Sequence, residues 1–148
     1  MTAKEKALNY LGRFARTEQQ VADYLARKEF PPEEINATIA YLREHKFVDD
    51  RAFAESFLQS RLRRLDGPLK IRQMLLQKGI AKALVDSLLK TQYPSELQIE
   101  SAAALLEKRM ARRSAGKERQ KLYRFLASRG FPGYVIIQAF QLHRREQK

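Results

Sequence analysis

The chain has 148 residues, no cysteine and a formal net charge of +12 at pH 7. The length allows one ordinary domain or several small ones, and the lack of cysteine excludes disulfides and thiolate metal sites. The longest apolar run is only five residues, from Ala102 to Leu106, and the first residues contain no apolar signal core. We therefore expect a soluble cytoplasmic protein with no membrane partner.

The positive charge increases along the chain. Residues 1–50 carry 8 Lys or Arg against 9 Asp or Glu, residues 51–100 carry 9 against 5, and residues 101–148 carry 12 against 3. The three thirds thus have net charges of −1, +4 and +9. This uneven distribution predicts a surface that meets a polyanion, which is either nucleic acid or an acidic protein face.

The first third of the chain has the pattern of three short helices. Apolar residues spaced by three and four predict a helix over Lys4–Phe14, with Phe14 on its apolar stripe. Thr17 and Gln20 have the spacing of a capping box, so a second helix begins there and ends near Glu29. The pair Pro31–Pro32 then opens a third helix.

A long helix follows, and its end is unusually basic. Asp49 is a candidate N-cap for a helix over Asp50–Leu65. Its last turn carries Arg61, Arg63 and Arg64. One arginine would complement the helix dipole, so three indicate an anion or an acidic partner.

The helical pattern repeats twice more. Gly67 and Pro68 open a helix whose apolar face includes Ile71, Met74 and Leu75, and Gly79 ends it. Further apolar-rich helices are predicted over 83–89, 97–113 and 134–142, and another follows residue 116. The breaks at Phe30, Ile80 and Phe131 are separated by 50 and 51 residues, which indicates an internal repeat. No alternating strand pattern is present.

The sequence thus predicts an all-α protein of three tandem three-helix repeats in an elongated, curved arrangement. The expected repeats span 1–46, 47–93 and 94–148, the last strongly basic.

Catalytic chemistry is poorly represented in the sequence. The chain has two histidines, His45 and His143, and neither a P-loop nor a Rossmann glycine fingerprint nor an HExxH pair. Asp49 and Asp50 are better explained as a helix start than as an acid–base pair. We expect no enzyme activity, no cofactor and no metal site.

The central motifs resemble a known family. FVDDRAFA at Phe47–Ala54, the pair Ser60–Arg61, Gly67–Gln73 with its KIRQ, and KGI at Lys78–Ile80 are similar to the middle repeat of the RecX family of bacterial regulatory proteins. Tyr10, Leu11 and the segment Thr17–Phe30 resemble its first repeat, and Lys121–Phe131 resembles its third. One position departs from the family pattern, because Met74 stands where the family usually has a glutamate. We expect Met74 in the core and Arg72 or Lys78 free for outside partners.

The resemblance implies a monomer that lies in the helical groove of the filament formed by the RecA recombinase on DNA. There it would bridge RecA subunits and limit filament growth, recombination, ATP hydrolysis and the SOS response. Weak, non-specific binding to single- and double-stranded DNA would accompany this. The side chains expected to contact RecA or DNA are Arg61, Arg63, Arg64, Lys70, Arg72, Lys78, Arg109, Arg112, Arg113, Lys117, Arg119, Lys121 and Arg124.

Two alternatives remain open at this stage. The repeats could be helix-turn-helix-like units of a sequence-independent DNA-binding protein. Against this, the third helices at 83–89 and 134–140 are too apolar for a major groove. The chain could also be a helical scaffold for some other acidic protein.

Overall fold

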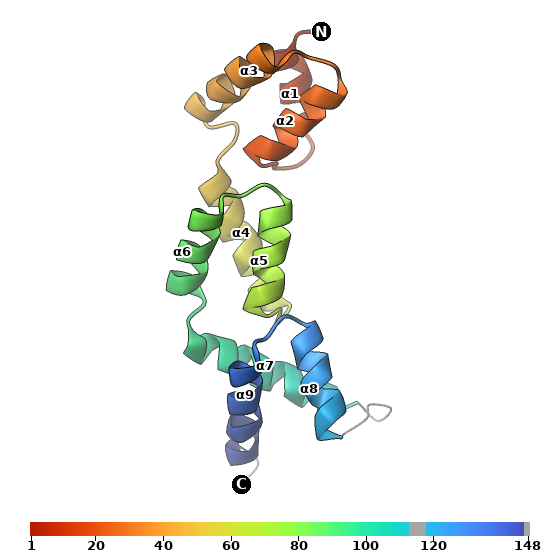
Figure 1. Ribbon diagram of the computed structural model, residues 1–148, viewed down its shortest axis with the longest axis vertical. Coiled ribbons are helices and arrows are strands. Elements are labelled where there is room, and N and C mark those ends of the chain that lie inside the picture. Colours follow the sequence, from red (N-terminus) through yellow and green to blue (C-terminus); the bar gives the residue numbers. More distant parts are fainter. Residues whose placement is uncertain (113–117, 147–148) are drawn as a thin grey trace.

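The computed structural model describes residues 1–112 and 118–146, and this part of the chain forms nine α-helices and no strand. The helices follow one another in three groups of three along an elongated body (Figure 1). This confirms the all-α fold expected from the sequence. We call the groups module one (α1–α3), module two (α4–α6) and module three (α7–α9). The helices are α1 (Ala3–Leu11), α2 (Glu18–Arg27), α3 (Pro32–Glu44), α4 (Asp50–Arg63), α5 (Pro68–Gln77), α6 (Lys82–Gln92), α7 (Ser95–Met110), α8 (Arg119–Ser128) and α9 (Gly133–Glu146).

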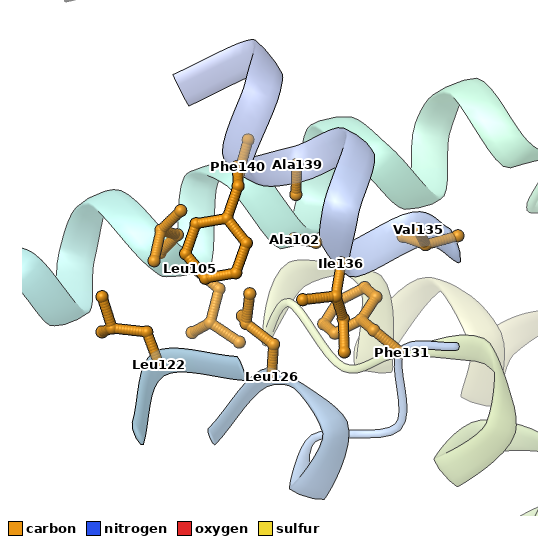
Figure 2. Close-up of a cluster of buried hydrophobic side chains, with 11 residues drawn as sticks. Ala102, Leu105, Leu122, Leu126, Phe131, Val135, Ile136, Ala139 and Phe140 are labelled. Carbon is orange, nitrogen blue, oxygen red and sulfur yellow. The ribbon is translucent and has the colours of Figure 1, made fainter. Parts of the chain in front are cut away.

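Each module has a hydrophobic core of its own. Fully buried side chains at the three centres include Leu25 in module one, Leu75 in module two and Leu126 in module three. Figure 2 shows the third core, where Leu126 of α8 and Phe140 of α9 point into one cluster. The cores are not fully separate, because Leu65, which lies between α4 and α5 of module two, packs against the core of module three. The repeat boundaries at 46/47 and 93/94 stay a prediction.

Local side-chain chemistry starts the helices where the sequence predicts. The Thr17 hydroxyl accepts a hydrogen bond from the Gln20 N–H at 3.1 Å, and the Gln20 side chain accepts one from the Thr17 N–H at 3.0 Å. Asp49 caps α4 by accepting from the Ala52 N–H at 3.0 Å. Pro32 and Pro68 occupy the first turns of α3 and α5. These caps confirm the predicted helix starts.

The middle helix of every module ends in the same turn. Glu29, Gly79 and Gly130 all lie in the left-handed region, with φ of 67°, 87° and 97°. The next residue then turns back and donates its backbone N–H to a carbonyl five positions earlier, at 3.2, 3.2 and 3.3 Å. This hydrogen bond is the Schellman pattern, and it confirms the repeat at atomic detail.

Two similar joints connect the modules. At the first, the Thr17 hydroxyl donates to the Lys78 carbonyl at 2.5 Å. At the second, the Gly67 N–H donates to the Arg129 carbonyl at 2.7 Å. In both joints, the turn after the middle helix of one module lies against the start of the middle helix of the preceding module.

Two details of the predicted core are wrong. Helix α1 ends at Leu11 with Gly12 as its C-cap, so Phe14 lies beyond the helix and is 65% exposed. Met74 is only half-buried, because Ile71 and Leu75 occupy the centre of the α5 face and Met74 lies at its edge.

Candidate binding surfaces

Asp66 forms ion pairs with three basic side chains near the joint between modules two and three. Its carboxylate is 1% exposed and lies 3.2 Å from Arg61 Nη1, 3.3 Å from Lys70 Nζ and 3.1 Å from Arg129 Nη2. Arg129 also donates to the Arg64 carbonyl at 2.8 Å. Arg61 and Lys70 therefore have a partner inside the chain, whereas the sequence suggested an outside one. Sequence reasoning missed Asp66 because Arg129 is 63 positions away.

The charge state of Asp66 follows from these neighbours. Burial works to raise the pKa of its carboxyl, but hydrogen bonds from Arg129, Lys70 and Arg61 and the positive charge of Lys70 outweigh it. The pKa of Asp66 is therefore lower than usual, and the group is a carboxylate at neutral pH. The backbone carbonyl of Asp66 is also bonded, because it accepts a hydrogen bond from the Tyr93 hydroxyl at 2.8 Å.

The remaining candidates of module two divide into paired and unpaired side chains. Arg72 Nε lies 2.8 Å from Asp86 Oδ1, so the expectation that Arg72 is free is wrong. Lys78 Nζ lies 5.4 Å from the centre of the Phe57 ring, which is a cation–π distance. Arg63 and Arg64 are exposed, and neither side chain makes an ion pair within 1–112 or 118–146.

Module three contains a concave basic site between α7 and α8, which we call the basic pocket. It has a volume of about 280 Å³ and is lined by Leu105, Lys108, Arg109, Arg112, Phe125 and Arg129. The guanidinium of Arg109 lies 4.6 Å from the centre of the Phe125 ring, and that of Arg129 lies 6.0 Å from it. Among the described residues, no carboxylate lines this pocket.

The other candidates of module three lie outside the basic pocket. Arg119 is stacked over Phe140 at 4.3 Å. Lys121 and Arg124 are exposed on α8. Arg113 and Lys117 lie outside the described residues, and their contacts stay a prediction.

A second concave site, missed by the sequence analysis, lies beside the joint between modules one and two, and we call it the apolar groove. It has a volume of about 460 Å³, and its lining includes Arg16, Lys46, Phe47, Phe53 and Phe57. Phe47 is 50% exposed, and the Arg16 Nε atom is buried without a hydrogen-bond partner in the described chain. The site forms only in the fold, since its lining comes from the linker between α1 and α2, from the linker between α3 and α4, and from α4 itself.

Within the described residues, no helix is long and apolar enough to cross a bilayer, and no three His, Cys, Asp or Glu side chains are grouped to hold a metal ion.

Comparison with known proteins assigns all three modules. Family profiles described as the first, second and third three-helix domains of RecX match residues 3–42, 49–89 and 96–140 in that order. The fold and the comparisons thus define a chain of three tandem three-helix domains. This chain belongs to the RecX family.

Individual relatives agree with this assignment. The "Regulatory protein RecX" of Levilactobacillus brevis is 40% identical over 133 residues, which cover 87% of this chain and 50% of the relative. That of Caldanaerobacter subterraneus is 31% identical over 140 residues, 95% of this chain and 70% of the relative. The crystal structure of RecX from Lactobacillus salivarius has a TM-score of 0.85 at 28% identity, covering 96% of this chain and 94% of that one. The chain spans only about half the length of several curated relatives that it matches.

Proposed function

We propose that this protein is a cytoplasmic, monomeric, non-enzymatic regulator that binds RecA and its nucleoprotein filament on DNA. It inhibits filament growth, recombination and ATP hydrolysis, and thereby acts in DNA repair and the SOS response. The observation that carries this proposal is the match of all three modules, in order, to the three RecX domains. The relatives are named regulatory proteins, which agrees with a regulatory role.

The shape of the molecule supports binding to an extended partner. Three small cores lie along one elongated body, and hydrogen bonds join each module to the next (Figure 1). Weak contacts from several modules add up to tight binding when their spacing matches the repeat of the partner. A filament offers such a repeat, whereas a small globular partner does not.

The apolar groove supports a protein partner in addition to DNA. Its walls contain the rings of Phe47, Phe53 and Phe57. Apolar pockets of this size are typical of sites that receive a bulky side chain, and a phosphate backbone has nothing comparable to insert. We therefore assign the groove to contact with a RecA subunit.

A second candidate function is DNA binding alone, which the basic pocket favours. The third helix of module two argues against specific readout, because Val85, Leu88 and Leu89 face the core. Binding through the basic side chains would be independent of sequence and would weaken steeply with salt. Binding to DNA of any sequence at physiological salt, with no effect on RecA ATP hydrolysis, would favour this candidate over the first.

The test is a pull-down of RecA with and without single-stranded DNA, combined with an assay of RecA ATP hydrolysis. Wild-type protein is expected to sediment with filaments and to inhibit hydrolysis. Phe47→Ser should weaken inhibition about tenfold or more, as removal of an interface anchor does. Phe14→Ser is the matched control, since Phe14 is 65% exposed but does not line the groove. Unchanged hydrolysis with wild-type protein would contradict the proposal.

A further inference from the structure

The basic pocket carries positive charge that is only partly offset within the part of the chain that the structure describes. Of its lining cations, Arg129 is paired with Asp66, as Arg61 is, whereas the half-buried Arg109 has no carboxylate partner there. In the part of the chain that the structure describes, Lys108, Arg109 and Arg112 make no ion pair, although Arg109 is half-buried on α7 and the exposed Lys108 and Arg112 lie within three residues of it. Like charges gathered around one hollow raise the free energy of the folded chain. The cluster therefore does not stabilise the fold, whereas an external anion would offset its charge.

Two of the guanidinium groups that line the pocket, those of Arg109 and Arg129, have contacts that position them. Arg109 is stacked on Phe125 at 4.6 Å, and stacking leaves the N–H groups at the edge of the guanidinium plane available for paired hydrogen bonds to oxygen. Arg129 is held at the pocket wall by Asp66 and by the Arg64 carbonyl. A site with cations held in advance binds an anion with a smaller loss of side-chain entropy.

The surroundings of the pocket indicate a polyanion with regularly repeated charges. Lys121 lies four residues before Phe125 on α8, so it shares that helix face and extends the positive charge beyond the pocket. Lys121 is exposed and, like Lys108, has no ion pair among the described residues. A row of cations that continues past a single site fits successive phosphates of one strand better than one isolated carboxylate.

We propose that the basic pocket binds a phosphodiester group of a single-stranded DNA backbone. The proposal deepens the DNA contact of the function given above and rests on it for the biological setting. Arg109 binds the phosphate oxygens from α7 and Arg112 binds them from just beyond the end of that helix, while Lys108 at the rim and Arg129, which stays paired with Asp66, contribute positive charge. Leu105 and Phe125 form the floor and contact the sugar.

The test measures fluorescence anisotropy of a labelled 12-nucleotide oligo-dT, with no RecA present, over a series of salt concentrations. The pocket variant is Lys108→Ala/Arg112→Ala, which changes two exposed side chains. The control variant is Arg13→Ala/Arg27→Ala, which removes the same charge from exposed positions in module one. The pocket variant should weaken binding on the order of tenfold, and the slope of log K against log salt should become shallower by about 1.4, or about 0.7 for each lost phosphate contact. The control variant should change the affinity less than about twofold.

Thermal unfolding separates a binding role from a structural one. Because the pocket cations repel one another, the pocket variant should melt at the wild-type temperature or above it. If it melts earlier, the single variant Arg112→Ala repeats the binding test with one exposed side chain changed. Its slope should then become shallower by about 0.7, and an unchanged slope would overturn the proposal.

Two further outcomes overturn the proposal. An equal loss of affinity in the pocket and control variants would mean that overall charge, and no particular site, attracts DNA. Displacement of the oligonucleotide by a 12-residue polyglutamate as readily as by unlabelled oligo-dT would assign the pocket to an acidic protein. Neither result depends on RecA, so the function proposed above is judged separately by the pull-down and ATP hydrolysis assays.

Discussion

Asp66 is the residue on which the joint between modules two and three depends most. Its buried carboxylate accepts from one cation of α4, one of α5 and one at the end of α8. A buried carboxylate is stable only when it is paired, and here the pairs link segments of two modules. The residue therefore acts as an electrostatic clamp between the modules.

Replacement of this carboxylate should be costly. Asp66→Asn is expected to lower the free energy of unfolding by about 2–3 kcal/mol, because it leaves three half-buried cations without their common partner. Urea denaturation at pH 7 measures this loss. Asp86→Asn is the control, since its ion pair with Arg72 is exposed to solvent and should contribute little.

The pH dependence of that loss has a definite sign. The pKa of Asp66 is lowered by folding, so its contribution is fully present above the unfolded value of about 3.9 and disappears as the pH falls below it. The difference in stability between wild-type protein and Asp66→Asn should therefore shrink below pH 4. A difference that stays constant down to pH 2 would contradict the assigned ion pairs.

Tyr93 should make the free energy of unfolding depend on pH on the alkaline side. Burial raises the pKa of its phenol, a hydrogen bond with Ser101 lowers it and the nearby charge of Asp66 raises it, so that the pKa lies at about 12. Stability should then fall as the pH rises above about 10. Tyr93→Phe should cost about 1 kcal/mol at pH 7 through the lost hydrogen bond to the Asp66 carbonyl, and should flatten this alkaline decline. Urea denaturation at pH 7 and pH 11 measures both effects.

At the scale of elements, the turn that ends each middle helix serves two purposes. All three turns need a residue with positive φ, which glycine adopts most easily. The turns at Gly79 and Gly130 also touch the preceding module, where an added Cβ would lie 2.2 Å from Gln19 Cβ or 2.5 Å from Lys70 Cβ. Glu29 is exposed, and a Cβ is accommodated there.

These three turns should therefore respond differently to substitution. Gly79→Ala is expected to cost about 2–3 kcal/mol, because it combines backbone strain with a collision at the joint. Glu29→Gly should change stability by no more than about 1 kcal/mol, because relief of strain offsets the larger entropy of glycine in the unfolded chain. Chemical denaturation of both variants makes the comparison. A cost of no more than about 1 kcal/mol for Gly79→Ala would mean that backbone strain at positive φ, without a collision at the joint, selects glycine there.

The helices themselves were largely predictable, because their caps and turns depend on neighbours in sequence. Thr17 with Gln20, Asp49, and Gly67 with Pro68 each predict a helix start that the fold contains. Phe14 was placed wrongly because apolar spacing does not show where a helix stops. The apolar groove could not be predicted, since Arg16 and Phe53 meet only after α4 docks beside module one.

At the scale of the whole molecule, stability is divided among modules that meet at narrow joints. The helix pairs with the most extensive contact in the described chain, such as α7 with α9, lie within modules (Figure 1). A tandem array of this kind is stabilised by each unit and by each interface between neighbours. Damage at one joint should therefore act mainly on the modules next to it.

Hydrogen exchange can test this division. Gly130→Ala should weaken the second joint, so amides of α7–α9 should exchange faster, by about tenfold or more, while those of α1–α3 keep their protection. Gly79→Ala should instead affect α1–α3 and spare α8 and α9. Uniformly faster exchange along the chain in both variants would indicate a single cooperative unit.

The sequence by itself determined the helices, their caps, the repeat of about 50 residues and the increase of charge toward the third module, because all of these depend on residue type and short-range spacing. Only the tertiary structure decided which cations are available. Arg61 and Lys70 are bound by Asp66 together with the distant Arg129, whereas no carboxylate within residues 1–112 and 118–146 pairs with Lys108 or Arg112. Charge counts locate positive residues along a chain, but whether each one is neutralised depends on what folding brings within a few ångströms of it.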